Sequence, residues 1–145
     1  MATKPGYASA IHDVVDRLFV YGSLRTGQPA RSLIQDHVVA SVPARTTGRL
    51  IGFADYPGLL DDGPGPVVGE LLTLTDLAAA FALLDAYEGG DFVRVLRRIE
   101  RTDDGDGDRA AEGAGIWAWC YLLADPRLAD DGVPVPGGDW ARFRP

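Results

Sequence analysis

The sequence predicts an α+β fold: a small mixed or antiparallel sheet that curls towards a barrel and carries a few flanking helices. Segments typical of strands clearly outnumber those typical of helices, and only one helical segment is strong. Strands and helices also fail to alternate as a doubly wound sheet requires. The 145 residues fit a single domain over residues 1–145, with a core at about 17–124 and a C-terminal tail at 125–145.

The first strand is expected over residues 17–21, because these are β-rich and the tight-turn pair Gly22-Ser23 follows. Pro29 can start a short helix over residues 30–35. Residues 37–53 again favour strand structure, and the Gly and Pro residues within 54–66 predict a loop. Further strands are expected over residues 67–74, 92–101 and 116–123.

The one strong helix is expected over residues 76–88, with Thr75 as its N-cap. Its apolar stripe consists of Leu77, Phe81 and Leu84, at steps of four and three residues. Gly89-Gly90 is typical of a left-handed C-terminal cap.

Composition restricts the classes of partner. The chain carries 14 Lys and Arg against 21 Asp and Glu, a net charge of −7, and its arginines at 94–101 run into an acidic loop. An acidic domain repels phosphate backbones, so we expect a small-molecule partner and no nucleic acid. No apolar run approaches the roughly 20 residues that span a bilayer. The N-terminal residues contain no signal-peptide pattern, which predicts a cytoplasmic protein.

Glu88 breaks the pattern of the helix. Four residues after Leu84, it continues the apolar stripe and is expected to point towards the core. Burial and the negative end of the helix dipole would both raise its pKa, towards the value that a proton shuttle needs at neutral pH. The alternative is a frayed helix end with Glu88 in water.

The segment Tyr21-Gly22-Ser23-Leu24 is the second candidate site. A strand that ends in Gly-Ser exposes successive backbone N–H groups, which can line a concave anion site. The alternative is an ordinary β-turn. Trp117, Trp119 and Tyr121 share one face of a strand, where core packing is the first expectation, although Tyr121 can present its hydroxyl to a pocket.

Other catalytic chemistries lack the residues they need. Ser23 would require a base, and the two histidines, His12 and His37, stand in no triad context. These histidines and the scattered carboxylates have no metal-ligand spacing, and no phosphate loop is present. The single cysteine, Cys120, excludes an internal disulfide. We therefore expect no metal and no cofactor.

Four segments, in order, resemble the motifs of the γ-glutamylcyclotransferase-like (AIG2-like) family. They are LFVYGSLR at 18–25, YPGL at 56–59, VGEL at 68–71, and LDAYEG at 84–89 followed by FVR at 92–94. The resemblance spans about residues 18–123, and Gly138-Asp139-Trp140 is similar to a tail of some bacterial members. The chain departs from the family at Phe92, where a Tyr is usual.

The resemblance implies a barrel-like sheet with a cavity at one end, and cyclisation of a γ-glutamyl amide to 5-oxoproline. It implies that Glu88 is the general acid and base, and that the backbone of Gly22, Ser23 and Leu24 binds the substrate carboxylate, with Tyr21 and Tyr121 also in the binding site. The outer wall of the pocket is expected from the Tyr56-Pro57 loop and the tail. Two alternatives stay open: a non-catalytic ligand-binding member, favoured by Phe92, and an interaction module that uses the acidic loop at 103–112.

Overall fold

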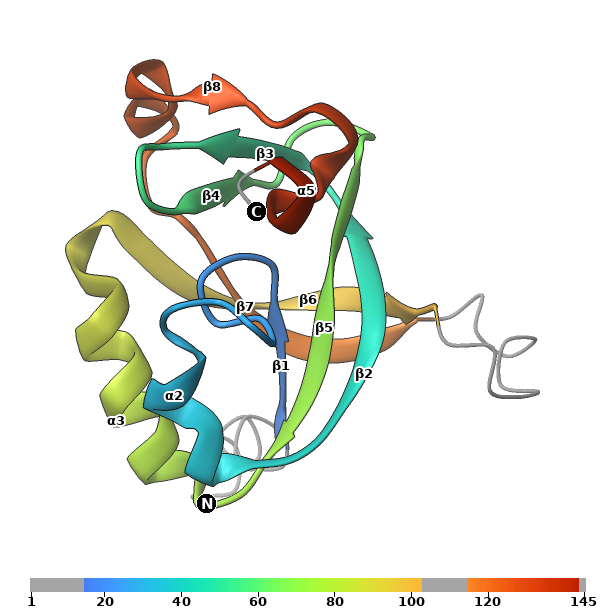
Figure 1. Ribbon diagram of the computed structural model, residues 1–145, viewed down its shortest axis with the longest axis vertical. Helices are drawn as coiled ribbons and strands as arrows, with labels where there is room; N and C mark the ends of the chain where they lie inside the picture. The colour runs from blue at the N-terminus through green and yellow to red at the C-terminus, as the bar shows by residue number, and fades with distance from the viewer. Residues whose placement is uncertain (1–14, 103–114, 144–145) are drawn as a thin grey trace, which may run out of the picture.

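The computed structural model describes residues 15–102 and 115–143. The acidic loop at 103–112 therefore lies outside the described residues. The described strands form a closed five-stranded barrel and a separate three-stranded sheet (Figure 1). This architecture confirms the predicted α+β barrel-like fold.

The barrel has the strand order β1-β5-β2-β6-β7. Its strands are β1 (Arg17–Val20), β2 (Val38–Thr47), β5 (Pro66–Leu74), β6 (Phe92–Arg101) and β7 (Ile116–Leu123). The pairs β1–β5, β5–β2, β2–β6 and β6–β7 are antiparallel, and one parallel pair, Leu18 with Trp119, closes the barrel between β1 and β7.

The second sheet has the order β4-β3-β8 and lies across one end of the barrel. Its strands are β3 (Arg49–Gly52), β4 (Pro57–Leu60) and β8 (Val133–Pro134). Strand β4 falls inside the predicted 54–66 loop, so that part of the prediction is wrong. Pro57 and Gly58 act here as a strand paired antiparallel to β3, and all four β4 residues are buried. Burial and pairing outweigh the local turn preference of Pro-Gly.

The helices cover one side of the barrel (Figure 1). They are α2 (Arg31–Ile34), the 3₁₀ turn η1 (Gln35–His37), α3 (Leu77–Glu88) and the 3₁₀ turn η2 (Gly89–Asp91). The prediction of Thr75 as the N-cap of α3 is wrong, because Asp76 occupies that position at φ 56° and no side chain caps the helix. Gly89 follows α3 at φ 70°, a conformation that favours glycine.

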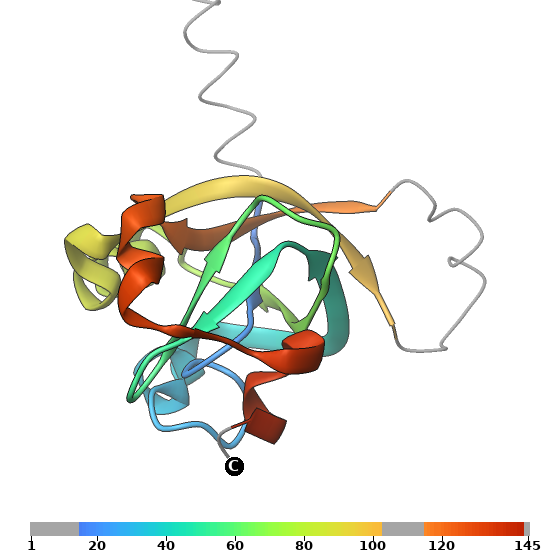
Figure 2. The ribbon, with the colours of Figure 1, turned by 90° about the horizontal axis from the view of Figure 1, so that it is seen from above.

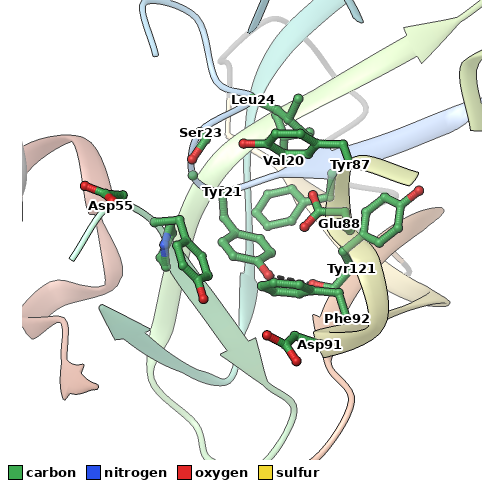
Figure 3. Close-up of a pocket in the computed structure, with 14 residues that line it drawn as sticks. Val20, Tyr21, Ser23, Leu24, Asp55, Tyr87, Glu88, Asp91, Phe92 and Tyr121 are labelled. Atoms are coloured by element: carbon green, nitrogen blue, oxygen red, sulfur yellow. Dashed lines mark hydrogen bonds between the residues drawn. The ribbon is translucent and has the colours of Figure 1, made fainter. Parts of the chain in front are cut away.

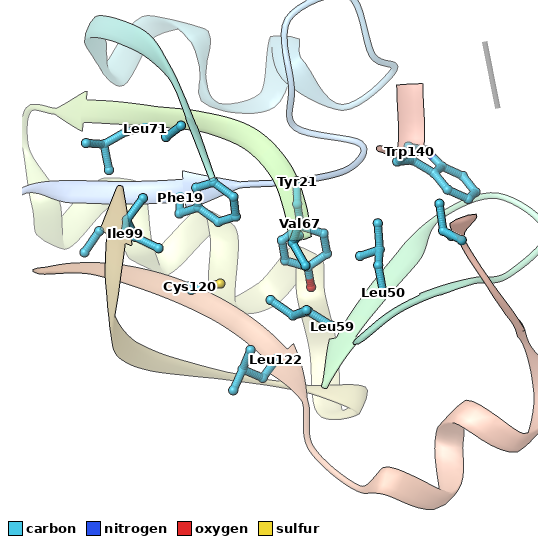
Figure 4. Close-up of a cluster of buried hydrophobic side chains, with 13 residues drawn as sticks. Phe19, Tyr21, Leu50, Leu59, Val67, Leu71, Ile99, Cys120, Leu122 and Trp140 are labelled. Carbon is cyan, nitrogen blue, oxygen red and sulfur yellow. The ribbon is translucent and has the colours of Figure 1, made fainter. Parts of the chain in front are cut away.

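The tail folds back over the second sheet, as the view from above shows (Figure 2). It contains η4 (Pro126–Asp131), β8, η5 (Pro136–Gly138) and the short helix α5 (Trp140–Phe143). Val135 and Trp140 join the cluster of buried side chains that fills the barrel (Figure 4). The tail is therefore part of the packing that closes this end of the barrel.

Two hydrophobic clusters lie on the two faces of the barrel wall. The inner cluster takes Phe19 from β1 and Ala118, Cys120 and Leu122 from β7. The outer cluster, between the barrel and the helices, takes Leu18 and Val20 from β1 and Trp119 and Tyr121 from β7, together with Phe81 and Leu84 of α3. Trp117 lies on the same face of β7 as Trp119 and Tyr121 but is 53% exposed, so the expected core role holds for Trp119 and Tyr121 alone. No helix among the described residues combines the length and the apolar character needed to cross a membrane.

Candidate active site

A pocket of about 340 Å³ lies where β1 ends, between the loop after β1, the segment before β4 and the end of α3 (Figure 3). All six residues singled out in the sequence line it: Tyr21, Gly22, Ser23, Leu24, Glu88 and Tyr121. Segments that are far apart in the sequence thus meet in one cavity.

Glu88 is the last residue of α3, and its carboxylate projects among the pocket residues (Figure 3). Phe81 and Leu84 of the same stripe are buried, so the helix presents one continuous face to the barrel. The helix extends through Glu88 without fraying. Within the part of the chain that the structure describes, no group hydrogen-bonds this carboxylate. Burial raises the pKa of Glu88 to about 7.

The loop after β1 leaves backbone donors unused. The Gly22 carbonyl accepts from the Arg25 N–H at 3.0 Å, and the Ser23 carbonyl accepts from the Ala30 N–H at 2.9 Å. The N–H groups of Gly22, Ser23 and Leu24 donate to no other described residue. Successive free N–H groups at the edge of a cavity have the arrangement that binds an anion.

Gly22 brings this loop against β4. A Cβ atom at this position would lie 2.5 Å from Pro57 Cγ, so any larger residue would push the loop and β4 apart. Pro57 itself lines the pocket, and with Asp55 and Tyr56 it confirms the expected wall from this loop. No described residue of the tail, 125–143, lines the pocket, so the expected wall from this part of the chain is wrong. The tail instead packs on β3.

Glu70 of β5 anchors the other end of the same loop. Its carboxylate accepts from the Thr26 N–H at 3.1 Å and from the Thr26 hydroxyl at 3.0 Å. It also forms an ion pair with Arg31 at 2.9 Å, and both side chains are mostly buried. A second ion pair, from Arg25 to Asp139 at 2.9 Å, ties the loop to the tail.

The hydroxyls of the two predicted binding tyrosines are engaged within the protein. Tyr21 Oη donates to the Tyr121 carbonyl at 2.6 Å, and its pKa is raised well above the ordinary value, mainly by burial. Tyr121 Oη donates to Asp85 Oδ1 at 2.6 Å. The rings of both residues line the pocket, so their contribution there is apolar surface and the hydroxyl of Tyr121 is not free for a ligand.

Sequence reasoning missed three polar residues of the lining: Asp55, Tyr87 and Asp91. Asp55 and Asp91 lie outside the barrel strands and α3, where no periodicity indicates which side chain faces a cavity. Tyr87 precedes Glu88 and lies off the apolar stripe of α3, which agrees with its exposure of 47%. The only sequence signal for Tyr87 in the pocket was that it directly precedes Glu88.

The site offers no nucleophile with a base. His37 contacts the Thr75 carbonyl at 3.1 Å through Nδ1, away from the pocket, and His12 lies outside the described residues. Cys120 is fully buried in the barrel, and burial raises its pKa to about 12, so its thiol stays protonated. Among residues 15–102 and 115–143, no three His, Cys, Asp or Glu side chains gather where they could hold a metal ion.

Comparisons with known proteins identify the family of the chain. The family described as γ-glutamyl cyclotransferase, AIG2-like, matches residues 18–142. No curated protein shows significant similarity to the chain.

Several solved structures share the fold. The protein c4763 of uropathogenic Escherichia coli has a TM-score of 0.65 at 21% identity, over 90% of this chain and 95% of its own. YkqA of Bacillus subtilis has a TM-score of 0.64 at 22% identity, over 90% of this chain, which spans 41% of YkqA. An AIG2-like protein from Mus musculus has a TM-score of 0.59 at 20% identity, over 87% of this chain and 94% of its own.

Proposed function

The chain belongs to the γ-glutamyl cyclotransferase, AIG2-like family, and on that premise we propose that it cleaves a γ-glutamyl amide by cyclisation, with Glu88 as general acid and base. The products are 5-oxoproline and the free amine that formed the amide. The observation that carries the proposal is the unpaired Glu88 carboxylate in the pocket, across from the free N–H groups of Gly22, Ser23 and Leu24.

The reaction needs only a proton acceptor that later returns the proton. Glu88 takes a proton from the α-ammonium of the γ-glutamyl group, and the freed amine attacks the γ-carbonyl carbon. A carbon–nitrogen bond of the five-membered ring forms, and the bond to the leaving nitrogen breaks as Glu88 delivers the proton to that nitrogen. The ring nitrogen then loses its second proton to the emptied Glu88 carboxylate, which passes it to the released amine, so that this amine leaves as an ammonium and Glu88 is restored. Atoms and charge balance without an external nucleophile, which suits a pocket without a triad.

A pKa near neutrality suits both halves of this cycle. A carboxylate with an ordinary pKa of 4.5 is too weak a base for an ammonium group, whereas one at about 7 can accept a proton and still release it. Water exclusion, which raises the pKa of Glu88, also strengthens the interaction of the carboxylate with the ammonium. The backbone N–H groups of residues 22–24 would hold the substrate α-carboxylate and thereby bring the amine towards the γ-carbonyl.

Turnover of a panel of γ-glutamyl amides, with 5-oxoproline detected by mass spectrometry, tests the proposal. We expect release from at least one member of the panel, and a loss of about 10²–10⁴-fold in kcat for Glu88→Gln, because that variant keeps the shape but cannot transfer the proton. Glu100→Gln is a matched control, since Glu100 pairs with Arg45 on the exposed side of the barrel wall. Folded protein without turnover on a broad panel would contradict the proposal.

Phe92 favours a second function, a non-catalytic module that binds a small γ-glutamyl ligand. This residue lines the pocket where the family usually has Tyr, so one hydroxyl is missing from the wall. Two results together would support this function over the enzyme. The parent would turn over no substrate, and 5-oxoproline or a substrate analogue would bind both the parent and Glu88→Gln. A small-molecule partner and a cytoplasmic location stay predictions.

A further inference from the structure

Behind the pocket, on the outer side of the barrel wall, three polar side chains from three elements form one network. Asp85 of α3 accepts from Tyr121 Oη of β7 at 2.6 Å. It also accepts from Arg94 of β6 through two parallel bonds, at 3.0 Å from Nε and 3.1 Å from Nη2. The bidentate geometry fixes the orientation of both partners.

Arg94 is held in place by two aromatic rings that meet edge to face. Its guanidinium carbon lies 4.1 Å from the ring centroid of Phe81 and 4.6 Å from that of Trp119. Both rings are buried in the outer cluster. Cation–π contacts with these two rings therefore fix the guanidinium of Arg94, and the ion pair with Arg94 in turn fixes the carboxylate of Asp85.

The network holds the end of α3 that carries Glu88. Asp85 lies three residues before Glu88, almost one helical turn. In the last two turns of α3, as far as the structure describes the chain, Asp85 is the only side chain that hydrogen-bonds another element. Leu83 and Tyr87 of the same turns are exposed.

The same network reaches the loop after β1. Tyr121 connects α3 to this loop. Its hydroxyl donates to Asp85 of α3, and its backbone carbonyl accepts from Tyr21 Oη at 2.6 Å. Tyr21 begins the segment with the free N–H groups. Two hydrogen bonds, one at each end of Tyr121, thus join the helix of Glu88 to the loop across from it. Figure 3 shows Tyr21 and Tyr121 side by side at the pocket.

We propose that Asp85, Arg94 and Tyr121 are positioning residues, which set the separation between Glu88 and the loop at 21–24 without donating to the substrate. The inference rests on the proposed function for its kinetic consequence, but the placement of Glu88 can be measured without turnover. A misplacement of about 1 Å at a reacting group can cost up to about 10²-fold in rate, so a network of this kind acts on kcat before it acts on binding.

Tyr121→Phe is the central test, because it removes one hydroxyl and no charge. We expect the pKa of Glu88, followed by carboxyl ¹³C NMR and assigned by its loss in Glu88→Gln, to fall from about 7 towards 4.5 as the released helix end reaches water. On a turned-over substrate, kcat should fall by about ten-fold with KM changed by less than about two-fold. Asp85→Asn should act in the same direction.

Asp62→Asn is the matched control. Arg49 binds Asp62 through the same two-bond geometry, at 3.1 and 3.2 Å, but this pair makes no hydrogen bond to a residue that lines the pocket, as far as the structure describes the chain. It should change neither the titration of Glu88 nor the kinetics. An unchanged pKa of Glu88 in both Tyr121→Phe and Asp85→Asn would overturn the inference, whether or not any substrate is turned over. If the parent turns over no substrate but the pKa of Glu88 still shifts in the two variants, the proposed function is contradicted and the positioning role is supported.

Discussion

At Glu88 the burial of the position opposes the charge of the side chain. The apolar stripe of α3 buries this position, and burial without a partner is unfavourable for a charged carboxylate. Fold stability alone favours an apolar residue here. A carboxylate kept at such a position costs free energy that the domain must supply elsewhere, which is a frequent property of catalytic groups.

This cost makes stability depend on pH. The pKa of Glu88 rises from 4.5 to about 7 on folding, so between these values the folded state binds more protons than the unfolded state. Stability is therefore unaffected below pH 4.5 and falls as pH rises towards 7. Since one pKa unit corresponds to about 1.4 kcal/mol, the loss above pH 7 is up to about 3 kcal/mol.

Glu88→Gln should remove this loss. We expect the variant to unfold at the same urea concentration as the parent at pH 4, and to be more stable by up to about 3 kcal/mol at pH 8. Urea unfolding at both pH values measures the difference, with Glu100→Gln as the control for the loss of an exposed carboxylate. Equal stability of Glu88→Gln and parent at pH 8 would mean that the carboxylate reaches bulk water.

At the scale of elements, the loop between β1 and α2 is held from outside the pocket. Glu70 of β5 binds Thr26 of this loop and Arg31 at the start of α2. Arg25 of the loop binds Asp139 of the tail. We expect these anchors to hold residues 22–24 in place at the pocket, because a loop without them has more conformations open to it.

Glu70→Gln should therefore weaken substrate binding more than chemistry. The amide can keep one bond to Thr26 but loses the ion pair with Arg31, so we expect KM to rise by about 3- to 10-fold with kcat within about two-fold of the parent. Steady-state kinetics on any turned-over γ-glutamyl amide measures this split. A fall in kcat at constant KM would assign Glu70 to the chemistry instead.

The sequence was sufficient for features that depend on period and on local chemistry. The strand at 116–123 has the predicted bounds, and the stripe of Leu77, Phe81 and Leu84 predicted where Glu88 points. Strand β4 was missed because its formation depends on pairing with β3 and on burial, which no local signal encodes. The occupied hydroxyl of Tyr121 was missed for a similar reason, since its partner Asp85 is 36 residues away.

At the scale of the whole molecule, the barrel and its C-terminal tail share one cluster of buried side chains. The closed β-sheet leaves one end to be covered, and the β4-β3-β8 sheet and the tail cover it. Trp140 lies in the inner cluster and is 2% exposed. At Gly52 of β3, a Cβ would lie 3.0 Å from the Trp140 ring, so the tail and the sheet are in close contact.

Trp140→Ala should consequently destabilise the domain as a whole. Loss of a large buried aromatic side chain costs about 3–5 kcal/mol, through lost burial and the cavity that it leaves. We expect urea unfolding to stay a single transition at a lower midpoint, with the barrel tryptophans and the far-UV signal changing together. Phe143→Ala is the control, because Phe143 contacts the same ring but is 37% exposed and should cost much less. If Trp140→Ala left the midpoint unchanged, the tail would be an appendage, and the Arg25–Asp139 pair could not transmit its position to the loop beside the pocket.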